Sequence, residues 1–574
     1  MFHLVTLINF RQMKTTKICL TYVTCFVLTL FAAMSSPHEG LDKKVDSLLL
    51  AHYGAEGPGG AIAVISGEGV VLKRCFGMMN LEKNRKVDEH TLFDIASVAK
   101  QFTSFAILML EQQGQLDLDV DIRRYIPELP SYEHEVTIRH LMHHTSGVPS
   151  TDVLRLLGGL KLDETWTQQE EIEILRSYPH LNFPPNSEYL YSNGGYSLLA
   201  SIIERVTDQK FDDFMQQQVF APMKMNSAMV LTELPSDSSL FAVGYKKEEN
   251  GYSPFSSMND FSYGGGNIYA SIDDMIQWSG SILNPTLYNP AFFDRIQKPQ
   301  HILENGDTIT YTNGFFARTY KGLPMTDHSG GVPGFRSLLM YFPSEQIIIV
   351  YLGNLENNSF RSLSNAIAEM MFGEKFVEKP VAPRIAVEFD VEEVKRFEGN
   401  YRLPDGMELA FQLDKDTFWV VVPGGERYQL FAESENHFFL KAFDAQCTFI
   451  VSNDGNADEM IWHQRGSDNE ARRVTGTVPF MEDEKVFLSG TYKPQGLDAQ
   501  YRIVYEDDML TLYLPDTFSK YLGFGESEMS HINGDSFYLQ WLGLIELTRD
   551  GNGHIDGFVL LNLGRIRNVP FSKI

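Results

Sequence analysis

The sequence contains little cysteine and few basic residues, and both shortages exclude classes of protein. Four cysteines occur in 574 residues, and two of them, Cys19 and Cys25, lie in an apolar run near the N-terminus. The remaining pair, Cys75 and Cys447, is too sparse for a disulfide framework or a cysteine-rich zinc site. Lys and Arg number 48 against 75 Asp and Glu, which gives a formal net charge of -27. We therefore expect no nucleic-acid partner and no polybasic membrane anchor, because both depend on clustered cationic side chains.

Long hydrophobic runs are also scarce, since only one stretch approaches the length of a membrane helix. It reads ICLTYVTCFVLTLFAAMSS, follows Arg11, Lys14 and Lys17, and ends in small residues. This order is typical of a secretory signal peptide, which we place at residues 1–34. Met13 is an alternative start of translation, and an uncleaved membrane anchor is the alternative to cleavage. The sequence thus predicts an exported protein, periplasmic or secreted, without a membrane span once the signal is removed.

Beyond the predicted signal peptide, the pattern of apolar and polar residues changes once along the chain. Residues 38–378 mix helical and strand patterns, whereas residues 379–390 contain prolines and no helical period, which predicts a linker. Beyond the linker, short alternating segments separated by Gly, Asp and Asn are typical of all-β structure. In the first domain we expect helices at 99–113, 195–207 and 272–282 and strands at 60–66, 334–341 and 345–352.

The last third of the chain repeats itself. Gly399 and Tyr401 are matched by Gly490 and Tyr492, HFFL near Phe438 by SFYL, and NDGNADEMIW by RDGNGHIDGF, all in the same order. Several matches in one order predict two similar β-barrel or β-sandwich domains, at residues 391–478 and 484–574. One large β-sandwich with chance similarity is the alternative.

The stretch FDIASVAKQFTS carries a serine and a lysine three residues apart, Ser97 and Lys100. On a helix these positions share a face, so the two side chains can touch. A serine nucleophile needs a nearby base, and a lysine acts as one only when burial or another cation lowers its pKa. Tyr191, in the later motif Tyr191–Ser192–Asn193, is the candidate for relaying the proton, and Asn193 for holding the Lys100 amine and a substrate amide.

A third motif, His328–Ser329–Gly330–Gly331, stands at the end of an expected strand. If this strand runs beside Ser97, the backbone N–H groups of Ser97 and Gly331 form an oxyanion hole. Glycine at 330 lets a substrate backbone lie close, and His328 is predicted to position the substrate.

The order Ser-x-x-Lys, Tyr-x-Asn, His-x-Gly resembles the serine β-lactamase and penicillin-binding superfamily, in particular its class C β-lactamase branch. IRHLMHHTSGVP and GGVPGFRSLLMYFP are also similar to stretches of that group, and the resemblance covers residues 40 to 375. It implies an α+β fold, with an antiparallel sheet covered by helices and a helical lobe, followed by two small lipocalin-like β-barrels as in D-aminopeptidases. The expected function is an exported serine hydrolase acting through an acyl-enzyme on Ser97, a D-aminopeptidase-like peptidase or amidase, or an esterase. Its substrate would be a small molecule or short peptide.

Other functions remain open at this point. A β-lactamase or D-alanyl-D-alanine carboxypeptidase is an alternative, but His328 replaces the lysine with which those enzymes hold a substrate carboxylate. A catalytically silent binding or sensor protein is an alternative of another class, and a lipid or glycan ligand of the barrels is a third. A further open alternative is that one barrel reaches over the cleft and excludes long substrates.

Metal and cofactor chemistry is not expected. His140, His143 and His144 share a helix face, but no further ligand is evidently placed to complete a site, so HTSG is interpreted as a helix end and turn. Gly264 to Gly266 lack a P-loop lysine, and no G-x-S-x-G nucleophile elbow occurs.

Overall fold

The computed structural model describes residues 40–574, apart from 55, 162–163, 256–258, 286–292, 294, 296–300, 357–358, 378–383, 404–406, 423–425, 465–466 and 475–483. The predicted signal peptide and the first part of the predicted linker lie outside these residues. None of the helices in the described part of the chain is both long and apolar enough to cross a lipid bilayer.

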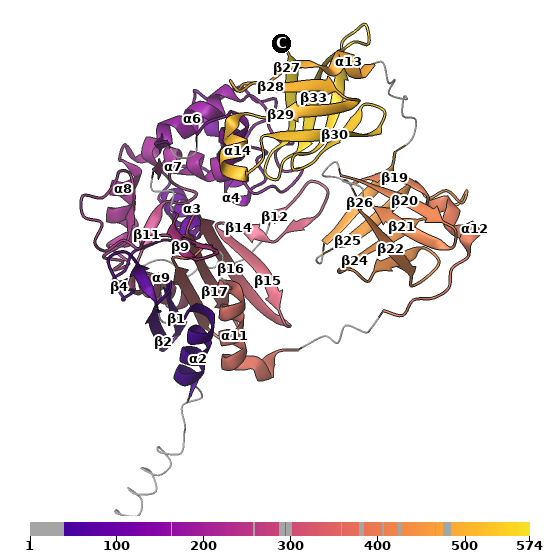
Figure 1. Ribbon diagram of the computed structural model, residues 1–574. Coiled ribbons are helices and arrows are strands. Elements are labelled where there is room, and N and C mark those ends of the chain that lie inside the picture. Colours follow the sequence, from indigo (N-terminus) through magenta and orange to yellow (C-terminus); the bar gives the residue numbers. More distant parts are fainter. Residues whose placement is uncertain are drawn as a thin grey trace, which may run out of the picture.

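The first domain is built on a seven-stranded antiparallel sheet in the order β14-β15-β16-β17-β18-β1-β2 (Figure 1). Its strands are β1 (Gly60–Ser66), β2 (Gly69–Phe76), β14 (Tyr311–Thr312), β15 (Phe315–Tyr320), β16 (Leu323–Val332), β17 (Phe335–Phe342) and β18 (Ile347–Gly353). All three predicted strands are confirmed as β1, β17 and β18.

Both faces of this sheet are buried, and alternate residues of each strand serve the two faces. In β1, Ile62 and Val64 pack with helices α2 (Leu41–Tyr53) and α11 (Phe360–Phe372). Ala61 and Ala63 belong to the opposite core, which includes α9 (Ile272–Leu283) and α3 (Lys100–Gln112). Burial on two sides explains the unbroken apolar run AIAVI, which a one-sided sheet would interrupt with polar residues.

A helical lobe packs beside the sheet, with α3 between them. The lobe contains α4 (Ile138–His143), α5 (Thr151–Leu157), α6 (Gln168–Ser177), α7 (Asn193–Thr207) and α8 (Phe211–Phe214). Helix α3 contacts α7, and the 3₁₀ turn η1 (Ala96–Ala99) just before it contacts β16. The helices predicted at 99–113, 195–207 and 272–282 are confirmed as α3, α7 and α9.

The C-terminal part forms two closed eight-stranded barrels with neighbouring strands in chain order, so the prediction of two similar domains is confirmed and a single sandwich is wrong. The first contains β19 (Gly399–Arg402), β20 (Glu408–Asp414), β21 (Thr417–Val421), β22 (Arg427–Ala432), β23 (His437–Leu440), β24 (Ala445–Ile450), β25 (Glu459–Gln464) and β26 (Ser467–Arg473). The second contains β27 (Gly490–Pro494), β28 (Tyr501–Glu506), β29 (Met509–Tyr513), β30 (Glu526–Asn533), β31 (Ser536–Leu539), β32 (Gly543–Arg549), β33 (Ile555–Asn562) and β34 (Arg567–Lys573). The repeated tyrosines, Tyr401 and Tyr492, lie in the first strand of each barrel and are fully buried.

Large side chains pack against one another in both barrels. In the first, the rings of Phe397 and Phe449 stack with centroids 4.3 Å apart, and in the second Phe558 and Phe571 stack at 4.4 Å. All four are buried, and each belongs to a core cluster of its barrel. Such packed interiors argue against a role for the barrels as containers for a lipid or glycan.

The two barrels relate differently to the first domain. The core of the second barrel is continuous with that of the helical lobe, whereas the first barrel has a separate core. The buried Tyr501 hydroxyl donates to the carbonyl oxygen of Leu157 at the end of α5 (2.9 Å). In Figure 1 the second barrel, in yellow, accordingly lies against the purple helices, and the orange first barrel lies beside it. The second barrel is therefore docked on the helical lobe of the first domain.

The docking of the second barrel on the helical lobe leads to a prediction for Gly496. This residue has a left-handed φ of 75° and approaches the lobe closely. A Cβ added there would lie 2.4 Å from the carbonyl oxygen of Ser177 at the end of α6. Gly496→Ala should therefore weaken docking by about 1–3 kcal/mol beyond the cost of the backbone strain. Small-angle scattering and limited proteolysis should report a larger radius of gyration and faster cleavage.

Gly523→Ala is the matched control, because Gly523 also has a left-handed φ, 83°, but an added Cβ meets nothing within 4 Å. Equal behaviour of the two variants would show that the Gly496 contact does not hold the barrel in place.

Candidate active site

A cleft of about 340 Å³ lies where η1, the start of α7 and the end of β16 meet. Its size falls within the usual range for small-molecule sites. The lining residues are Asp94, Ala96, Ser97, Thr151, Asp152, Arg155, Glu171, Asn193, Ser197, Asp260, Ser262, Tyr263, Gly265, Gly266, Asn267, Gly331, Val332, Pro333 and Arg565.

Ser97 is presented to the cleft by a strained turn. It is partly exposed, while residues 91–96 and 98–100 around it are buried. Ala96, just before it, has a φ of 47°, a left-handed conformation that costs a non-glycine residue roughly 1–2 kcal/mol. The Asp94 carboxylate accepts the Ala96 N–H at 2.7 Å, and the Ser337 hydroxyl donates to the Ile95 carbonyl at 2.6 Å. These two bonds fix the turn, so the serine hydroxyl has a defined direction.

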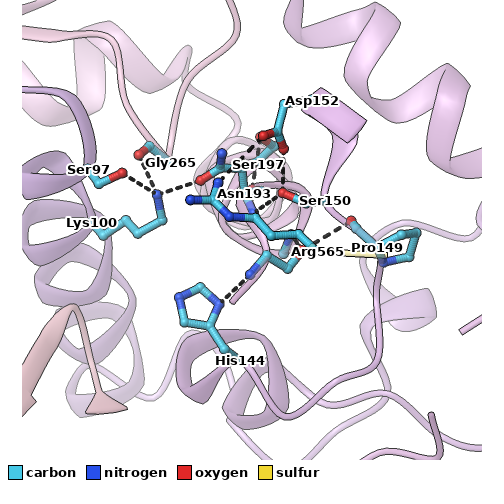
Figure 2. A network of polar contacts seen from close by, with 12 residues as sticks. Ser97, Lys100, His144, Pro149, Ser150, Asp152, Asn193, Ser197, Gly265 and Arg565 are labelled. Atoms are coloured by element: carbon cyan, nitrogen blue, oxygen red, sulfur yellow. Dashed lines mark hydrogen bonds and ion pairs between the residues drawn. The ribbon is translucent and has the colours of Figure 1, made fainter. Parts of the chain in front are cut away.

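Lys100 follows one turn later with its side chain completely buried. Its amine lies 3.3 Å from the Ser97 hydroxyl oxygen and donates to Asn193 Oδ1 (2.9 Å) and to the Gly265 carbonyl (2.6 Å). Figure 2 shows the amine between these three groups. No carboxylate is among these three partners, so the position offers little compensation for a buried positive charge.

Burial therefore lowers the pKa of Lys100 well below its usual range, and the nearby Arg565 lowers it further while Asp152 opposes the shift. A neutral amine has two hydrogens and one lone pair. The hydrogens are taken by Asn193 and Gly265, so the lone pair remains for the Ser97 O–H. This arrangement is that of a general base poised beside a nucleophile.

Tyr191 and Asn193 are held by the N-terminus of α7. Ser192 caps this helix by accepting the Gly195 N–H (3.1 Å), and its own N–H donates to Nδ1 of His144 (3.1 Å). The Tyr191 ring lies 4.9 Å from the Lys100 amine, and its hydroxyl oxygen is buried. Burial raises the pKa of Tyr191 above its usual range, and the Ser97 hydroxyl partly offsets that rise. The structure thus brings Ser97, Lys100, Tyr191 and Asn193 together.

His144 packs against Tyr191 and is hydrogen-bonded to Ser192. The sequence predicts only that a helix ends at this position. His144 terminates α4 with a φ of 59°, its ring lies 4.2 Å from that of Tyr191, and it is buried. Burial lowers the pKa of His144 well below its usual range, so the ring is neutral and Nδ1 accepts the Ser192 N–H. Among the described residues, no three or more His, Cys, Asp or Glu side chains are grouped so that they could hold a metal ion. His140 and His143 therefore do not belong to such a group.

The end of β16 runs beside the serine. Strand β15 pairs with β16 only as far as Asp327, so residues 328–332 have β17 on one side and η1 on the other. An added Cβ on Gly330 would lie 2.4 Å from the Ile95 carbonyl oxygen, which shows how closely strand and turn approach. Gly331 lines the cleft with Ser97, as an oxyanion hole made of their two N–H groups requires.

His328, which the sequence predicts to position the substrate, is held among neighbouring protein groups. Its ring is buried, with Nε2 3.3 Å from the Tyr311 hydroxyl and Nδ1 2.8 Å from the Ser329 carbonyl, and it does not line the cleft. Burial lowers the pKa of His328 to about 3, so it is neutral. Its contact with substrate stays a prediction, while its observed neighbours are Ser329, Tyr311 and the rings of Phe316 and Tyr191, whose centroids lie 5.4 and 6.1 Å from that of His328.

Several lining residues were not singled out from the sequence. Asp94 precedes Ser97 by three positions, and Asp152 lies beyond the HTSG turn, next to Ser150, whose hydroxyl accepts the Asn193 N–H behind the lining (3.0 Å). The sequence motifs identified the segments that contain these residues, but they did not identify the residues themselves. Arg565 comes from the second barrel, and no local pattern links it to the site.

A seven-stranded antiparallel sheet, a helical lobe and a serine–lysine pair between them define the β-lactamase and transpeptidase class of fold. The chain belongs to the β-lactamase family, whose model matches residues 48–370. A second family model, described as a domain of unknown function (DUF3471), matches residues 383–475, which contain the first barrel.

Individual proteins and structures similar to the chain agree with this family assignment. The chain is 27% identical over 437 residues to penicillin-binding protein 4* of Bacillus subtilis, covering 72% of this chain and 95% of the relative. It is 28% identical over 320 residues to D-aminopeptidase of Brucella ovis, covering 55% of this chain and 59% of that protein's length. The octameric penicillin-binding protein homologue from Pyrococcus abyssi has the same fold, with a TM-score of 0.50 and 21% identity over 75% of this chain and 99% of the homologue. Membership of the family supports assignment of the chain to the hydrolases.

Proposed function

We propose that the protein is an exported serine hydrolase that forms an acyl-enzyme on Ser97, and that it acts as a D-aminopeptidase-like peptidase or amidase, or as an esterase. The observation that carries this proposal is the completely buried Lys100 amine, 3.3 Å from the Ser97 hydroxyl and without an acidic group among its three hydrogen-bond partners. The family and the names of the relatives, penicillin-binding protein 4* and D-aminopeptidase, support the same chemistry.

In the first half of the reaction the Ser97 Oγ attacks the substrate carbonyl carbon while its proton moves to the Lys100 amine. The N–H groups of Ser97 and Gly331 stabilise the oxyanion that forms. The Tyr191 hydroxyl, which stays neutral because burial raises its pKa, accepts a proton from Lys100 and donates its own to the leaving amine or alcohol. The bond to the leaving group breaks, and the acyl group remains on Ser97.

In the second half, water takes the place of the leaving group. The neutral Lys100 amine, directly or through Tyr191, removes a proton from that water, which attacks the acyl carbon. The proton then returns to Ser97 as the acid product leaves. Asn193 Oδ1 holds the amine throughout, and its amide N–H₂ is available to a substrate carbonyl.

Covalent labelling tests this proposal. Incubation with a fluorophosphonate, and separately with a penicillin, should add the mass of one reagent to the tryptic peptide that contains Ser97, and Ser97→Ala should remain unlabelled. Ser104, buried on α3 and bonded to the Tyr196 hydroxyl, is the matched control, since Ser104→Ala should label like the natural protein. Absence of label on Ser97 in the folded protein would refute the proposal.

A substrate panel distinguishes the alternatives. It consists of D-amino acid amides, a D-Ala-D-Ala peptide, a chromogenic cephalosporin and short-chain esters. Fastest turnover of the amides supports the peptidase or amidase, and fastest turnover of the cephalosporin or the D-Ala-D-Ala peptide supports a β-lactamase or carboxypeptidase. Stoichiometric acylation of Ser97 without release of product would support the silent binding protein.

A further inference from the structure

The tip of one hairpin of the second barrel enters the cleft. Strands β33 and β34 are joined at Leu563–Ile566, whose end residues exchange two backbone hydrogen bonds. Gly564, at the first central position, has a φ of 62°, as a tight type II′ hairpin turn requires. Arg565 is the second central residue, so its side chain projects from the outermost point of the barrel into the lining of the cleft.

The backbone of this hairpin is held by groups other than the Arg565 side chain. The buried Asn182 of the catalytic domain accepts the Arg567 N–H (2.8 Å) and donates to the Arg565 carbonyl (3.5 Å). The Arg567 guanidinium pairs with Glu188, and Ile566 is fully buried in the shared core. Truncation of Arg565 should therefore leave the hairpin docked.

The Arg565 side chain itself is only loosely engaged. Its guanidinium lies over the Tyr191 ring, 4.9 Å from the centroid, and 3.5 Å from an Asp152 carboxylate oxygen. The two charged side chains are 44% and 50% exposed, so this ion pair is weak and leaves donors available to a ligand. Figure 2 shows the guanidinium beside Asn193 and facing Asp152, within the same network as Ser97 and Lys100. Asp152 also accepts the Ser150 hydroxyl (2.5 Å), so it keeps a partner if Arg565 turns to a ligand.

The other charges that line the cleft are largely neutralised. Arg155 pairs with Asp260 at 2.5 Å, and its side chain is only 6% exposed. Burial raises the pKa of Asp94 to about 7 and the pKa of Glu171 to about 7, so both carboxyls lose charge near neutral pH. Lys100 and His328 lie outside the cleft lining and are buried, and burial lowers the pKa of each below its usual range. Arg565 is thus the lining cation best placed to meet an anionic ligand.

We propose that Arg565 is a specificity-determining residue that binds the carboxylate of an acyl substrate, so that the second barrel supplies the cation that the His328–Ser329–Gly330 segment lacks. A guanidinium pairs with a carboxylate through two parallel N–H···O bonds, and charge-assisted bonds of this kind are about twice as strong as neutral ones. A local cation is needed for such a substrate, because the chain as a whole carries a formal charge of -27 and repels anions. The inference rests on the proposed acyl-enzyme at Ser97 and adds the substrate's charge to it.

Two matched pairs of thioesters test this inference. In the first pair the leaving group is thioglycolate or thioglycolamide, and in the second the acyl group is succinyl or its neutral methyl ester. Each pair differs by one carboxylate, and release of the thiol is followed in the natural protein, Arg565→Gln and Arg565→Lys. The first pair places the carboxylate in the leaving group and the second in the acyl group.

For at least one pair, we expect the natural protein to prefer the anionic member, and Arg565→Gln to lower the ratio of anionic to neutral kcat/KM by about 10- to 100-fold, the range for a hydrogen bond between charged groups. Arg565→Lys should keep part of the preference, which should also weaken at high ionic strength. Arg502→Gln, at an exposed position of β28 outside the cleft lining, is the matched control and should leave both ratios within about threefold.

Two results would overturn the inference. If Arg565→Gln lowers both members of each pair by the same factor, Arg565 only supports the docked hairpin, although the acyl-enzyme on Ser97 stands. If neither pair shows a preference for the anion in the natural protein, the carboxylate has no subsite. Failure of all four thioesters and of the fluorophosphonate to label Ser97 would instead overturn the proposed function, and this inference with it.

Discussion

Lys100→Met should lower kcat/KM by at least about 10³-fold while the protein remains folded. Methionine fills nearly the same buried volume without a polar group, but it has no basic nitrogen to take the Ser97 proton. The variant also leaves Asn193 Oδ1 and the Gly265 carbonyl without their amine donor, so we expect a loss of about 1–3 kcal/mol in stability. Steady-state kinetics with the best substrate of the panel, together with thermal unfolding, measures both effects.

Lys73→Met is the matched control for this change. Lys73 lies on β2, is 37% exposed and pairs with Asp273 at the surface, so its loss should change kcat/KM by less than about threefold. Because Ser97 and Lys100 act as one unit, the double variant Ser97→Ala/Lys100→Met should be no slower than Ser97→Ala alone. Full additivity of the two losses would mean that Lys100 does not serve as the base for Ser97.

The same base predicts the pH dependence of the reaction. Burial lowers the pKa of Lys100 well below its usual range, so the amine is neutral above that value and the rate falls when acid protonates it. Of the charged groups facing the amine, Arg565 lowers this pKa and Asp152 raises it. Removing Arg565 should therefore move the acid limb of the kcat/KM profile toward higher pH, and Asp152→Asn should move it toward lower pH.

Gly330→Ala should lower kcat/KM by about 10²-fold. The added Cβ would lie 2.4 Å from the Ile95 carbonyl oxygen and 2.9 Å from the Ala96 Cβ, so strand β16 must retreat from the serine turn by about 1 Å. A displacement of this size separates the Ser97 and Gly331 N–H groups from the position of the oxyanion, and misplacements of 1 Å cost about 10²-fold in rate. The measurement is kcat/KM with one uncharged ester.

Gly331→Ala provides the comparison at the next residue. There the added Cβ meets only the Arg336 side chain, at 3.3 Å and beyond, and this flexible group can move. Its effect should be at least about tenfold smaller than that of Gly330→Ala. If the two variants lose activity equally, the close approach of strand and turn does not set the rate.

Much of the catalytic domain could be predicted because the sequence patterns that indicate its helices, strands and motifs are local. The apolar run at residues 60–66 and the helical period after Ser97 indicate β1 and α3, and the ordered motifs single out Ser97, Lys100, Tyr191 and Asn193, which lie close together in the structure. The orientation of His328 was not predictable, because the direction of a strand side chain depends on the pairing partners on either side. The role of Arg565 could not be predicted for a different reason. Its place in the cleft depends on how the whole second barrel docks on the first domain.

The shared core of the second barrel and the helical lobe couples domain docking to ligand binding. A carboxylate that binds Arg565 contacts both partners, so the factor by which docking raises its affinity equals the factor by which the ligand raises the docking equilibrium. The covalent path through the first barrel keeps an undocked second barrel at a high local concentration, so reclosure is an intramolecular step. The charge of the substrate would then act on the closure of the enzyme as well as on its own affinity.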